Sequence, residues 1–261
     1  MSADKLVDES INGQTVASVE DVVAGSCIVD QFQRLADLDD QERALLASLE
    51  GELETFQADE VLQAAGQPVK RFFALHSGWA CAIRLLPDGQ RQVLDIFLPG
   101  QLMGLHEIGL AQAQSELIAI TELEACAIAR QALGEVFRRS PRLAEMFFLG
   151  LAREQAMLTE RIINLGRRPA NERLAHFLLE MQARLDPESE RIEIPMTQSL
   201  IGDALGLSSV HVSRTLSSLK DQGLIDSDNV HVRLCERDAL VELCSFDPVY
   251  LDARRRWLDE L

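Results

Sequence analysis

Residues 197–222 have the sequence TQSLIGDALGLSSVHVSRTLSSLKDQ, which divides at Gly206 into two short helical patterns. Apolar residues recur at helical spacing on both sides of this division, namely Ile201, Leu205, Val212, Leu216 and Leu219. The small residues Gly202 and Ala204 stand where two helices must approach closely, and Gly206 suits a turn that needs positive φ. The stretch therefore predicts a helix-turn-helix whose second helix starts at Ser208.

Polar side chains gather near the start of that second helix. They are Ser208, Ser209, His211, Ser213 and Arg214. Short hydrogen-bonding groups with one long cation suit a recognition helix that enters the major groove of DNA. We therefore expect double-stranded DNA as a partner.

The net charge of −17 over 261 residues looks unfavourable for a DNA-binding protein. Its distribution is uneven, because residues 1–60 contain 15 acidic and 3 basic side chains, whereas residues 167–223 contain 8 and 7. The acidity therefore does not exclude DNA binding, but it predicts modest non-specific affinity. No apolar stretch is long enough for a membrane span and no signal-peptide pattern is present, so we expect a cytoplasmic protein.

The N-terminal half has three segments with different sequence patterns. Residues 1–31 are acidic and lack a periodic apolar pattern, which predicts a mobile arm; a solvated tail and a mask that competes with DNA are the two alternatives. Leucines at helical spacing in residues 32–49 predict one or two short helices. Short apolar runs separated by turn residues then predict a β-barrel or β-roll over residues 50–130. The expected strands are residues 53–56, 61–63, 71–75, 79–86, 92–97 and 117–128, with a hairpin turn at Pro87-Asp88-Gly89.

Helices dominate the following segment. A short helix is expected over residues 131–137, and Ser140-Pro141 is typical of the start of a longer one that runs to about residue 165. Its apolar positions are Leu143, Phe147, Leu151, Leu158, Ile162 and Leu165. Such a stripe predicts a parallel homodimer, and the alternative is packing on the β-roll of the same chain.

The C-terminal third completes a winged-helix pattern. Gly166 to Pro169 predicts a break between domains. A helix over residues 171–185 and a strand over 191–194 precede the helix-turn-helix. A hairpin over residues 224–234, the wing, and a small helix over 237–244 follow it.

This order of elements resembles the Crp/Fnr family of bacterial transcription regulators. The most specific match is MTQSLIGDALGLSSVHVSRTLSSLKDQGLI, residues 196–225, which is similar to the family's helix-turn-helix from end to end. The resemblance implies an α+β fold, with a cyclic-nucleotide-binding-like β-roll joined by a long dimerisation helix to a winged helix-turn-helix. The implied parts are an acidic arm (1–31), a sensor-like β-roll (32–138), the dimerisation helix (139–166), the DNA-binding domain (167–245) and a tail (246–261).

The implied function is sequence-specific transcription regulation by a homodimer on a near-palindromic operator, with an unidentified signal acting at the β-roll. RNA polymerase is an expected partner if the protein activates transcription. The alternative is a cyclic-nucleotide-binding-like protein that acts through protein partners without binding DNA. We expect no enzyme, because the sequence has no GxSxG, P-loop or HExxH motif in a plausible context.

The resemblance also implies roles for single residues. Thr197, Gln198 and Ser208 match positions that contact phosphates, whereas Ser209, Val210 and Arg214 match positions that face bases. Arg214 suits bidentate contact with guanine. Val210 stands where well-known members have glutamate, and His211 adds another polar group. The operator is therefore expected to differ from the familiar one.

The effector region departs from the members that bind cyclic AMP. The matching positions are Gly104, Leu105, Gln114, Ser115, Leu158 and Thr159. Leu105 replaces the family's glutamate and Gln114 its arginine, so no cation balances a buried phosphate and we do not expect cyclic AMP.

Other cofactors of the family also match poorly. Only Cys27 precedes Cys81, which is too few thiolates for a four-cysteine iron–sulfur cluster. Haem would need an axial ligand, for which the candidates are His76, Cys81, Met103 and His106. A thiol sensor at Cys81 or Cys126 lacks an evident neighbouring base or second cysteine. We expect no bound metal, and the five cysteines are interpreted as separate thiols.

Overall fold

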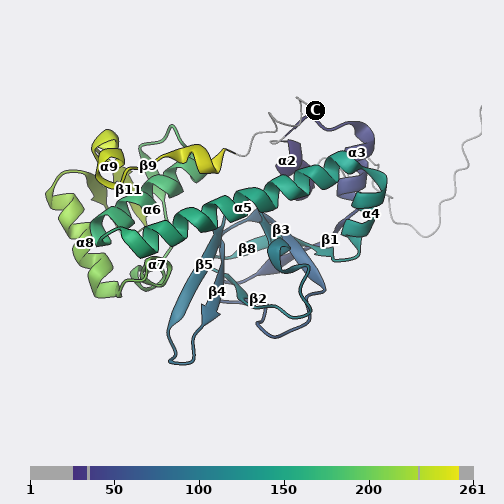
Figure 1. Ribbon diagram of the computed structural model, residues 1–261, viewed down its shortest axis with the longest axis horizontal. Helices are drawn as coiled ribbons and strands as arrows, with labels where there is room; N and C mark the ends of the chain where they lie inside the picture. Colours follow the sequence, from purple (N-terminus) through teal and green to yellow (C-terminus); the bar gives the residue numbers. More distant parts are fainter. Residues whose placement is uncertain (1–25, 34–35, 229, 253–261) are drawn as a thin grey trace, which may run out of the picture.

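The computed structural model of the chain describes residues 26–33, 36–228 and 230–252. Figure 1 shows a β-rich part beneath the long helix α5, short helices at one end of α5 and a mainly helical part at its other end. The predicted fold class is confirmed: a β-roll is followed by a long helix and a C-terminal winged helix-turn-helix.

Within the described residues, two four-stranded antiparallel sheets form the β-roll. One sheet has the order β1 (Glu50–Phe56), β8 (Leu123–Ala129), β3 (Arg71–Ser77) and β6 (Leu102–Met103). The other has the order β2 (Val61–Gln63), β7 (Glu116–Ala119), β4 (Ala80–Leu85) and β5 (Arg91–Phe97). Phe73, Phe97 and Leu117 are buried together in a core that both sheets contribute to, so each strand keeps an apolar inner face.

Two details of the strands differ from expectation. Residues 117–128 are two strands in different sheets, because the chain turns at Thr121, whose hydroxyl accepts a hydrogen bond from the Trp79 N–H at 3.0 Å. Strand β6 was not predicted, because a strand of two residues is too short to show an alternating pattern of apolar and polar residues. The predicted hairpin at Pro87-Asp88-Gly89 joins β4 to β5, and Gly89 has a φ of 85° there.

The predicted arm ends earlier than residue 31. Residues 26–33 include helix α2 (Cys27–Gln33), in which Ile28, Val29 and Phe32 are buried. Phe32 packs against Phe147 of α5 with ring centroids 4.7 Å apart. The arm was therefore predicted too long at its C-terminal end, and residues 1–25 lie outside the described residues. Helix α3 (Asp40–Ala47) follows and begins with a capping box between Asp39 and Glu42.

Two helices lead out of the β-roll, α4 (Ala132–Arg139) and α5 (Pro141–Arg167). The predicted start of α5 is confirmed, because Ser140 caps it by accepting the Leu143 N–H at 3.2 Å and Pro141 is its first residue. Its apolar positions form two faces. Leu143 and Phe147 are buried against the same chain, whereas Phe148 and Ile162 are each 61 % exposed.

The C-terminal part contains α6 (Ala170–Leu185), α7 (Gln198–Leu205), α8 (Ser209–Asp221) and α9 (Arg237–Cys244). A small antiparallel sheet of β9 (Arg191–Glu193), β10 (Ile225–Ser227) and β11 (His231–Leu234) has the order β10-β11-β9 and forms the wing. Buried Leu174, Leu178, Val212 and Leu219 join α6 to the helix-turn-helix in one apolar core. This core holds α8 in a fixed orientation.

The tail predicted from residue 246 onward begins as packed structure. Phe246 is buried against the ring of His176, and a 3₁₀ helix, η2 (Pro248–Leu251), follows. The Tyr250 hydroxyl donates a hydrogen bond to Glu180 Oε2 at 2.9 Å. Residues 246–252 therefore belong to the folded domain, and residues 253–261 lie outside the described residues. Among the helices described, none has the length and apolar character needed to cross a membrane.

Candidate nucleic-acid interface and effector region

The turn between α7 and α8 is fixed by backbone geometry. Gly206 has a φ of 62°, and the Leu207 N–H donates to the Gly202 carbonyl oxygen at 2.9 Å. A Cβ atom on Gly202 would lie 2.4 Å from the Leu207 carbonyl oxygen, which is far inside van der Waals contact. Two glycines therefore permit the close approach that the sequence predicted.

Side-chain caps start both helices of the motif. Thr197 Oγ1 accepts the Leu200 N–H at 3.1 Å, and Ser208 Oγ accepts the His211 N–H at 3.2 Å. Each hydroxyl keeps its own proton for a further acceptor. The caps therefore orient two of the residues predicted to contact phosphate, and the third, Gln198, is exposed at the first position of α7.

The predicted reading face is exposed at the start of α8. Ser209, Val210, His211 and Arg214 are exposed, with Val210 57 % exposed, and Ser213 is half-buried. Val212 and Thr215 lie on the opposite, buried face of the helix. Among the described residues, Arg214 makes no hydrogen bond or ion pair. Its guanidinium is therefore available to an external acceptor.

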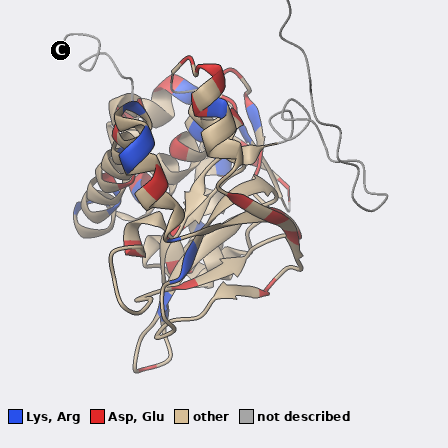
Figure 2. Ribbon diagram, turned by 90° about the vertical axis from the view of Figure 1, so that its right-hand side faces the viewer, with Lys and Arg blue, Asp and Glu red and all other residues tan. Residues whose placement is uncertain are grey.

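Cations near the wing are mostly paired with carboxylates. Arg191 lies 3.3 Å from Asp228, Arg233 lies 3.6 Å from Asp226, and Lys220 also lies 3.6 Å from Asp226. Figure 2 looks onto the opposite end of the molecule, the end of α2 to α4, where basic and acidic residues are also interspersed. Arg214 therefore differs from the paired cations beside the wing.

The predicted effector residues separate into two groups. Gly104, with a φ of 78°, precedes the 3₁₀ helix η1 (Leu105–Glu107), and Leu105 is buried. Leu158 and Thr159 lie on the exposed side of α5, where the Thr159 hydroxyl donates to the Gln155 carbonyl oxygen. In a single chain, Leu158 and Thr159 therefore point to solvent and away from Gly104 and Leu105.

A carboxylate occupies two hydrogen-bond donors of the predicted effector pocket. Glu107 Oε1 accepts from Ser115 Oγ at 2.8 Å and from the Gln114 N–H at 3.1 Å. Glu107 and Ser115 are both buried. Glu107 was not predicted as part of this region, although it stands only three positions after Gly104 in the sequence. With the chain's own carboxylate on these donors, a second anion would meet charge repulsion there.

A cavity of about 280 Å³ lies beside this region, between the β5–β6 loop, α5 and α6. Its polar lining includes Gln101, Arg153, Glu154 and Arg184, and of the six predicted effector residues only Leu105 contributes to it. The Nε atoms of Arg153 and Arg184 are buried and have no hydrogen-bond partner among the described residues. Burial raises the pKa of Glu154 to about 8. Asp95 also lines the cavity, and Arg184 is paired with Glu180 at 3.3 Å, so the lining favours a small polar ligand.

The four candidate haem ligands are not brought together at this cavity. None of His76, Cys81, Met103 and His106 is part of its lining. Cys81 and Met103 are buried in different apolar clusters. His106 instead lies 3.7 Å from Glu154 and 3.9 Å from Glu107.

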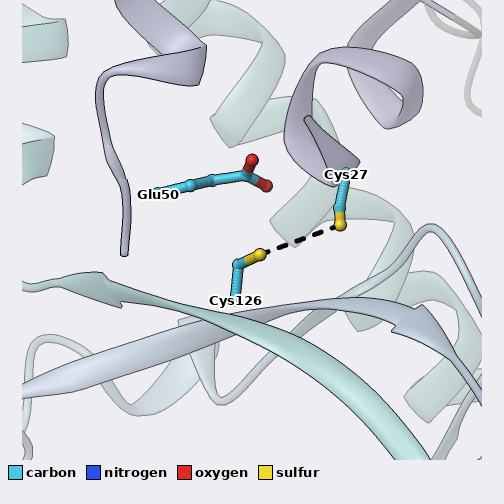
Figure 3. A group of neighbouring side chains, drawn as sticks. All are labelled: Cys27, Glu50 and Cys126. Carbon is cyan, nitrogen blue, oxygen red and sulfur yellow. Dashed lines mark hydrogen bonds between the residues drawn. The ribbon is translucent and has the colours of Figure 1, made fainter. Parts of the chain in front are cut away.

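Two of the thiols predicted to be separate are neighbours, as Figure 3 shows. Cys27 Sγ and Cys126 Sγ lie 3.9 Å apart, and His76 Nδ1 lies 3.2 Å from Cys27 Sγ. The prediction that Cys126 has no second cysteine or base nearby is therefore wrong. The hydrogen bond between the thiols, together with burial, raises the pKa of Cys27, and the same bond lowers the pKa of Cys126.

Comparison with known protein families gives two matches in the same order as the two domains. Residues 53–140 match the model of a cyclic nucleotide-binding domain, and residues 172–243 match that of a Crp-like helix-turn-helix domain. The first covers most of the β-roll, and the second extends from α6 to α9.

Similar curated proteins are regulators. The nitrogen fixation regulation protein FixK of Rhizobium meliloti is 30 % identical over 192 residues, which cover 73 % of this chain and 86 % of that protein. The anaerobic regulatory protein of Pasteurella multocida is 26 % identical over 220 residues, covering 83 % and 81 % of the two chains. The solved structure of FixK2 from Bradyrhizobium japonicum is 29 % identical with a TM-score of 0.70, over 75 % of this chain and 98 % of that one. The chain belongs to the Crp/Fnr family of bacterial transcription regulators.

Proposed function

We propose that the chain is a sequence-specific DNA-binding transcription regulator that acts as a homodimer on a near-palindromic operator. The observation that carries this proposal is the start of α8, where Ser209, Val210, His211 and Arg214 are exposed side by side and Arg214 is unpaired among the described residues. A rigid apolar core beneath α8 supports the same role, because a recognition helix must keep its orientation in the major groove.

The readout is assigned by position on the helix-turn-helix. Thr197, Gln198 and Ser208 hold the phosphate backbone and set the register, whereas Arg214 reads a guanine through two hydrogen bonds. Val210 offers only an apolar contact, which suits a thymine methyl group. His211 and Ser213 complete the polar edge of the reading face.

The dimer contact is assigned to the outer face of α5. Phe148, Leu158, Ile162 and Ile163 are exposed there, with exposed fractions between 39 % and 61 %. An apolar stripe of this kind on a long helix is hidden when two copies pair side by side. The pair would then present two α8 helices about 34 Å apart, one turn of B-DNA.

A signal would act through the cavity that contains Arg153, Glu154 and Arg184. The unpartnered Nε atoms of its two arginines and its position between the β-roll, α5 and α6 favour a small polar ligand that would alter the docking of the DNA-binding domain. Glu107 already occupies the Ser115 and Gln114 donors, which argues against a cyclic nucleotide at the family's usual position. We place the protein in the cytoplasm, with RNA polymerase as a partner if it activates.

Selection from a pool of random DNA duplexes with the purified full-length chain tests this function. We expect an inverted repeat with a G·C pair at the Arg214 position of each half-site and with half-site centres about 10 base pairs apart. If no sequence is enriched and no duplex is retained at low salt, the chain acts instead through protein partners, and the proposal is overturned.

A further inference from the structure

Three distant segments of the chain bring two cysteines and a glutamate together at the start of α2. Cys27 is the first residue of α2, Glu50 the first residue of β1, and Cys126 lies within β8 (Figure 3). The two sulfur atoms and a carboxylate oxygen of Glu50 all lie within 4.8 Å of one another. Cys27 is 4 % exposed and Cys126 is 6 % exposed, so the group lies at the buried junction between the helix and the sheet.

The Glu50 carboxylate is held at the start of α2 by hydrogen bonds. Glu50 Oε1 accepts the Ile28 N–H at 2.8 Å, and the carboxylate also accepts hydrogen bonds from the Cys27 backbone and the Ser26 side chain. His76 is exposed and lies on the solvent side, with Nδ1 3.2 Å from Cys27 Sγ. Cys244, by contrast, is a buried thiol that donates to a backbone carbonyl of its own helix, Leu240, at 3.1 Å. Cys27 and Cys126 thus have one another, a carboxylate and an imidazole as neighbours.

We propose that Cys27, Glu50 and Cys126 bind one thiophilic divalent cation of the Zn²⁺ class, with a water molecule as the fourth ligand and with His76 outside the group of ligands. The distances suit this assignment, because tetrahedral zinc with Zn–S bonds of about 2.3 Å separates two sulfur ligands by about 3.8 Å. The observed sulfur separation is 3.9 Å. A disulfide would require the same atoms to approach to about 2.0 Å.

A divalent ion offsets most of the ligand charge. Two thiolates and one carboxylate supply three negative charges, so the occupied site has a net charge of −1. Binding forms two metal–sulfur bonds and one metal–oxygen bond, and the thiol protons leave to solvent past the exposed His76. No electron is transferred. The ligand set of soft sulfur with oxygen selects Zn²⁺ over Mg²⁺ or Ca²⁺.

The site would fix the position of α2. Cys27 belongs to α2, whereas Glu50 and Cys126 belong to the sheet, so one ion joins the helix to the β-roll. Phe32, near the other end of α2, packs on Phe147 of α5 at 4.7 Å. Metal binding would therefore also stabilise the packing against α5. This inference does not depend on DNA binding.

Titration of the reduced, chelator-treated full-length chain with Co²⁺ tests the site. We expect one equivalent to give d–d bands in the visible range and a thiolate-to-cobalt charge-transfer band, both removed by Zn²⁺. Cys27→Ser and Cys126→Ser should lose the charge-transfer band. The matched control is Cys81→Ser, a buried thiol of the same β-roll outside the group, which should keep it. His76→Ala should keep the charge-transfer band, because the imidazole lies outside the group of ligands.

Thermal unfolding separates loss of the site from loss of the fold. Zn²⁺ should raise the Tm of the wild type and of Cys81→Ser and leave that of Cys126→Ser unchanged, with all three giving the same circular dichroism spectrum. The absence of a cobalt spectrum in the reduced wild type, or its retention in Cys126→Ser, would overturn the proposal. Iron with acid-labile sulfide in the isolated protein would overturn it as well, and so would a Cys27–Cys126 disulfide in a chain that binds no metal when reduced.

Discussion

Arg91 of β5 donates two hydrogen bonds, from Nε at 3.1 Å and from Nη2 at 2.8 Å, to Oδ2 of Asp203 in α7. This ion pair joins the β-roll directly to the first helix of the helix-turn-helix. The side chains are 43 % and 22 % exposed, so solvent screens the pair and its contribution is about 0.2–1 kcal/mol. Its importance lies in orientation, because it ties α7 to a strand of the other domain.

A double-mutant cycle measures this link. Arg91→Ala and Asp203→Ala should each lower the free energy of unfolding slightly, and the double variant should lose less than the sum of the two, by about 0.2–1 kcal/mol. The coupling should fade at high salt, because exposed charges are screened there. A coupling energy of zero at low salt would mean that the two domains do not use this contact in solution.

Arg214 should carry sequence preference rather than general affinity. Arg214→Ala should cost about 1–3 kcal/mol on the selected operator and change binding to random duplex little, because a base contact is lost and the phosphate contacts stay. Fluorescence anisotropy with both duplexes measures the difference. Arg138→Ala is the matched control, since this arginine is exposed on α4 and paired with Glu135. Equal losses on both duplexes would show that Arg214 contacts phosphate instead.

Ile162 tests the dimer face of α5. Ile162→Glu places a charge at a position that is 61 % exposed in one chain and would be covered in a dimer. We expect a shift from dimer to monomer in analytical ultracentrifugation and a loss of operator affinity, with the thermal stability of the single chain unchanged. Leu85→Glu, at a β4 position that is 62 % exposed, is the control that should stay dimeric. A dimer that survives Ile162→Glu would place the contact elsewhere.

Residue spacing along the chain predicted those elements whose structure depends on contacts between residues close in sequence. The helix-turn-helix could be predicted from the sequence because its main contacts are local. Gly202, Gly206 and the apolar positions within 197–222 contact residues only a few positions away in the chain. The buried helix α2 was missed, although Ile28, Val29 and Phe32 already had helical spacing, because the acidic composition of residues 1–31 dominated the prediction. Its burial depends on Phe147, more than 100 positions later in the chain.

The sites depended on contacts that no local pattern contains. Cys27 and Cys126 are 99 positions apart in the sequence and meet because α2 packs on β8. The sequence alone shows that Gln114 replaces the family's arginine. It does not show that the Glu107 carboxylate accepts hydrogen bonds from Ser115 and Gln114, because the fold brings these residues together. The exposed residues of α8 were the easiest to name, since caps and periodicity alone decide which side of the helix faces outward.

Glu154 should make stability depend on pH. Burial is the main cause that raises its pKa from 4.5 to about 8, nearby Asp95 adds to the rise, and Arg153 opposes it; His106 also lies 3.7 Å away. The folded chain keeps a proton that the unfolded chain releases, so this contribution is complete below about pH 4.5 and is lost as the pH rises to about 8.

The Tm of the wild type should therefore fall between pH 5 and pH 8, and the Tm of Glu154→Gln should fall less over the same range. A pKa raised from 4.5 to about 8 corresponds to at most about 5 kcal/mol, at about 1.4 kcal/mol per pKa unit. Because the side chain is 24 % exposed, solvent screening lowers the expected change in the free energy of unfolding to about 2 kcal/mol. Thermal unfolding followed by circular dichroism at several pH values measures it. Glu52→Gln, at an exposed position of β1, should leave the profile of the wild type unchanged. An identical pH profile for Glu154→Gln and wild type would show that this carboxyl is ionised throughout.

Gly202 should tolerate no side chain. A Cβ atom there would lie 2.4 Å from the Leu207 carbonyl oxygen, and because that atom belongs to the backbone, α7 and the turn must shift to accept it. Gly202→Ala should therefore lower the free energy of unfolding by about 1–3 kcal/mol and weaken operator binding through displacement of α8. Gly150→Ala provides the opposite control, because nothing lies within 4 Å of a Cβ at this position in α5. It should stabilise the chain by about 0.4–1 kcal/mol, since alanine loses less backbone entropy in a helix. Urea unfolding measures both variants, and equal stability of Gly202→Ala and wild type would mean that the turn relaxes to admit a methyl group.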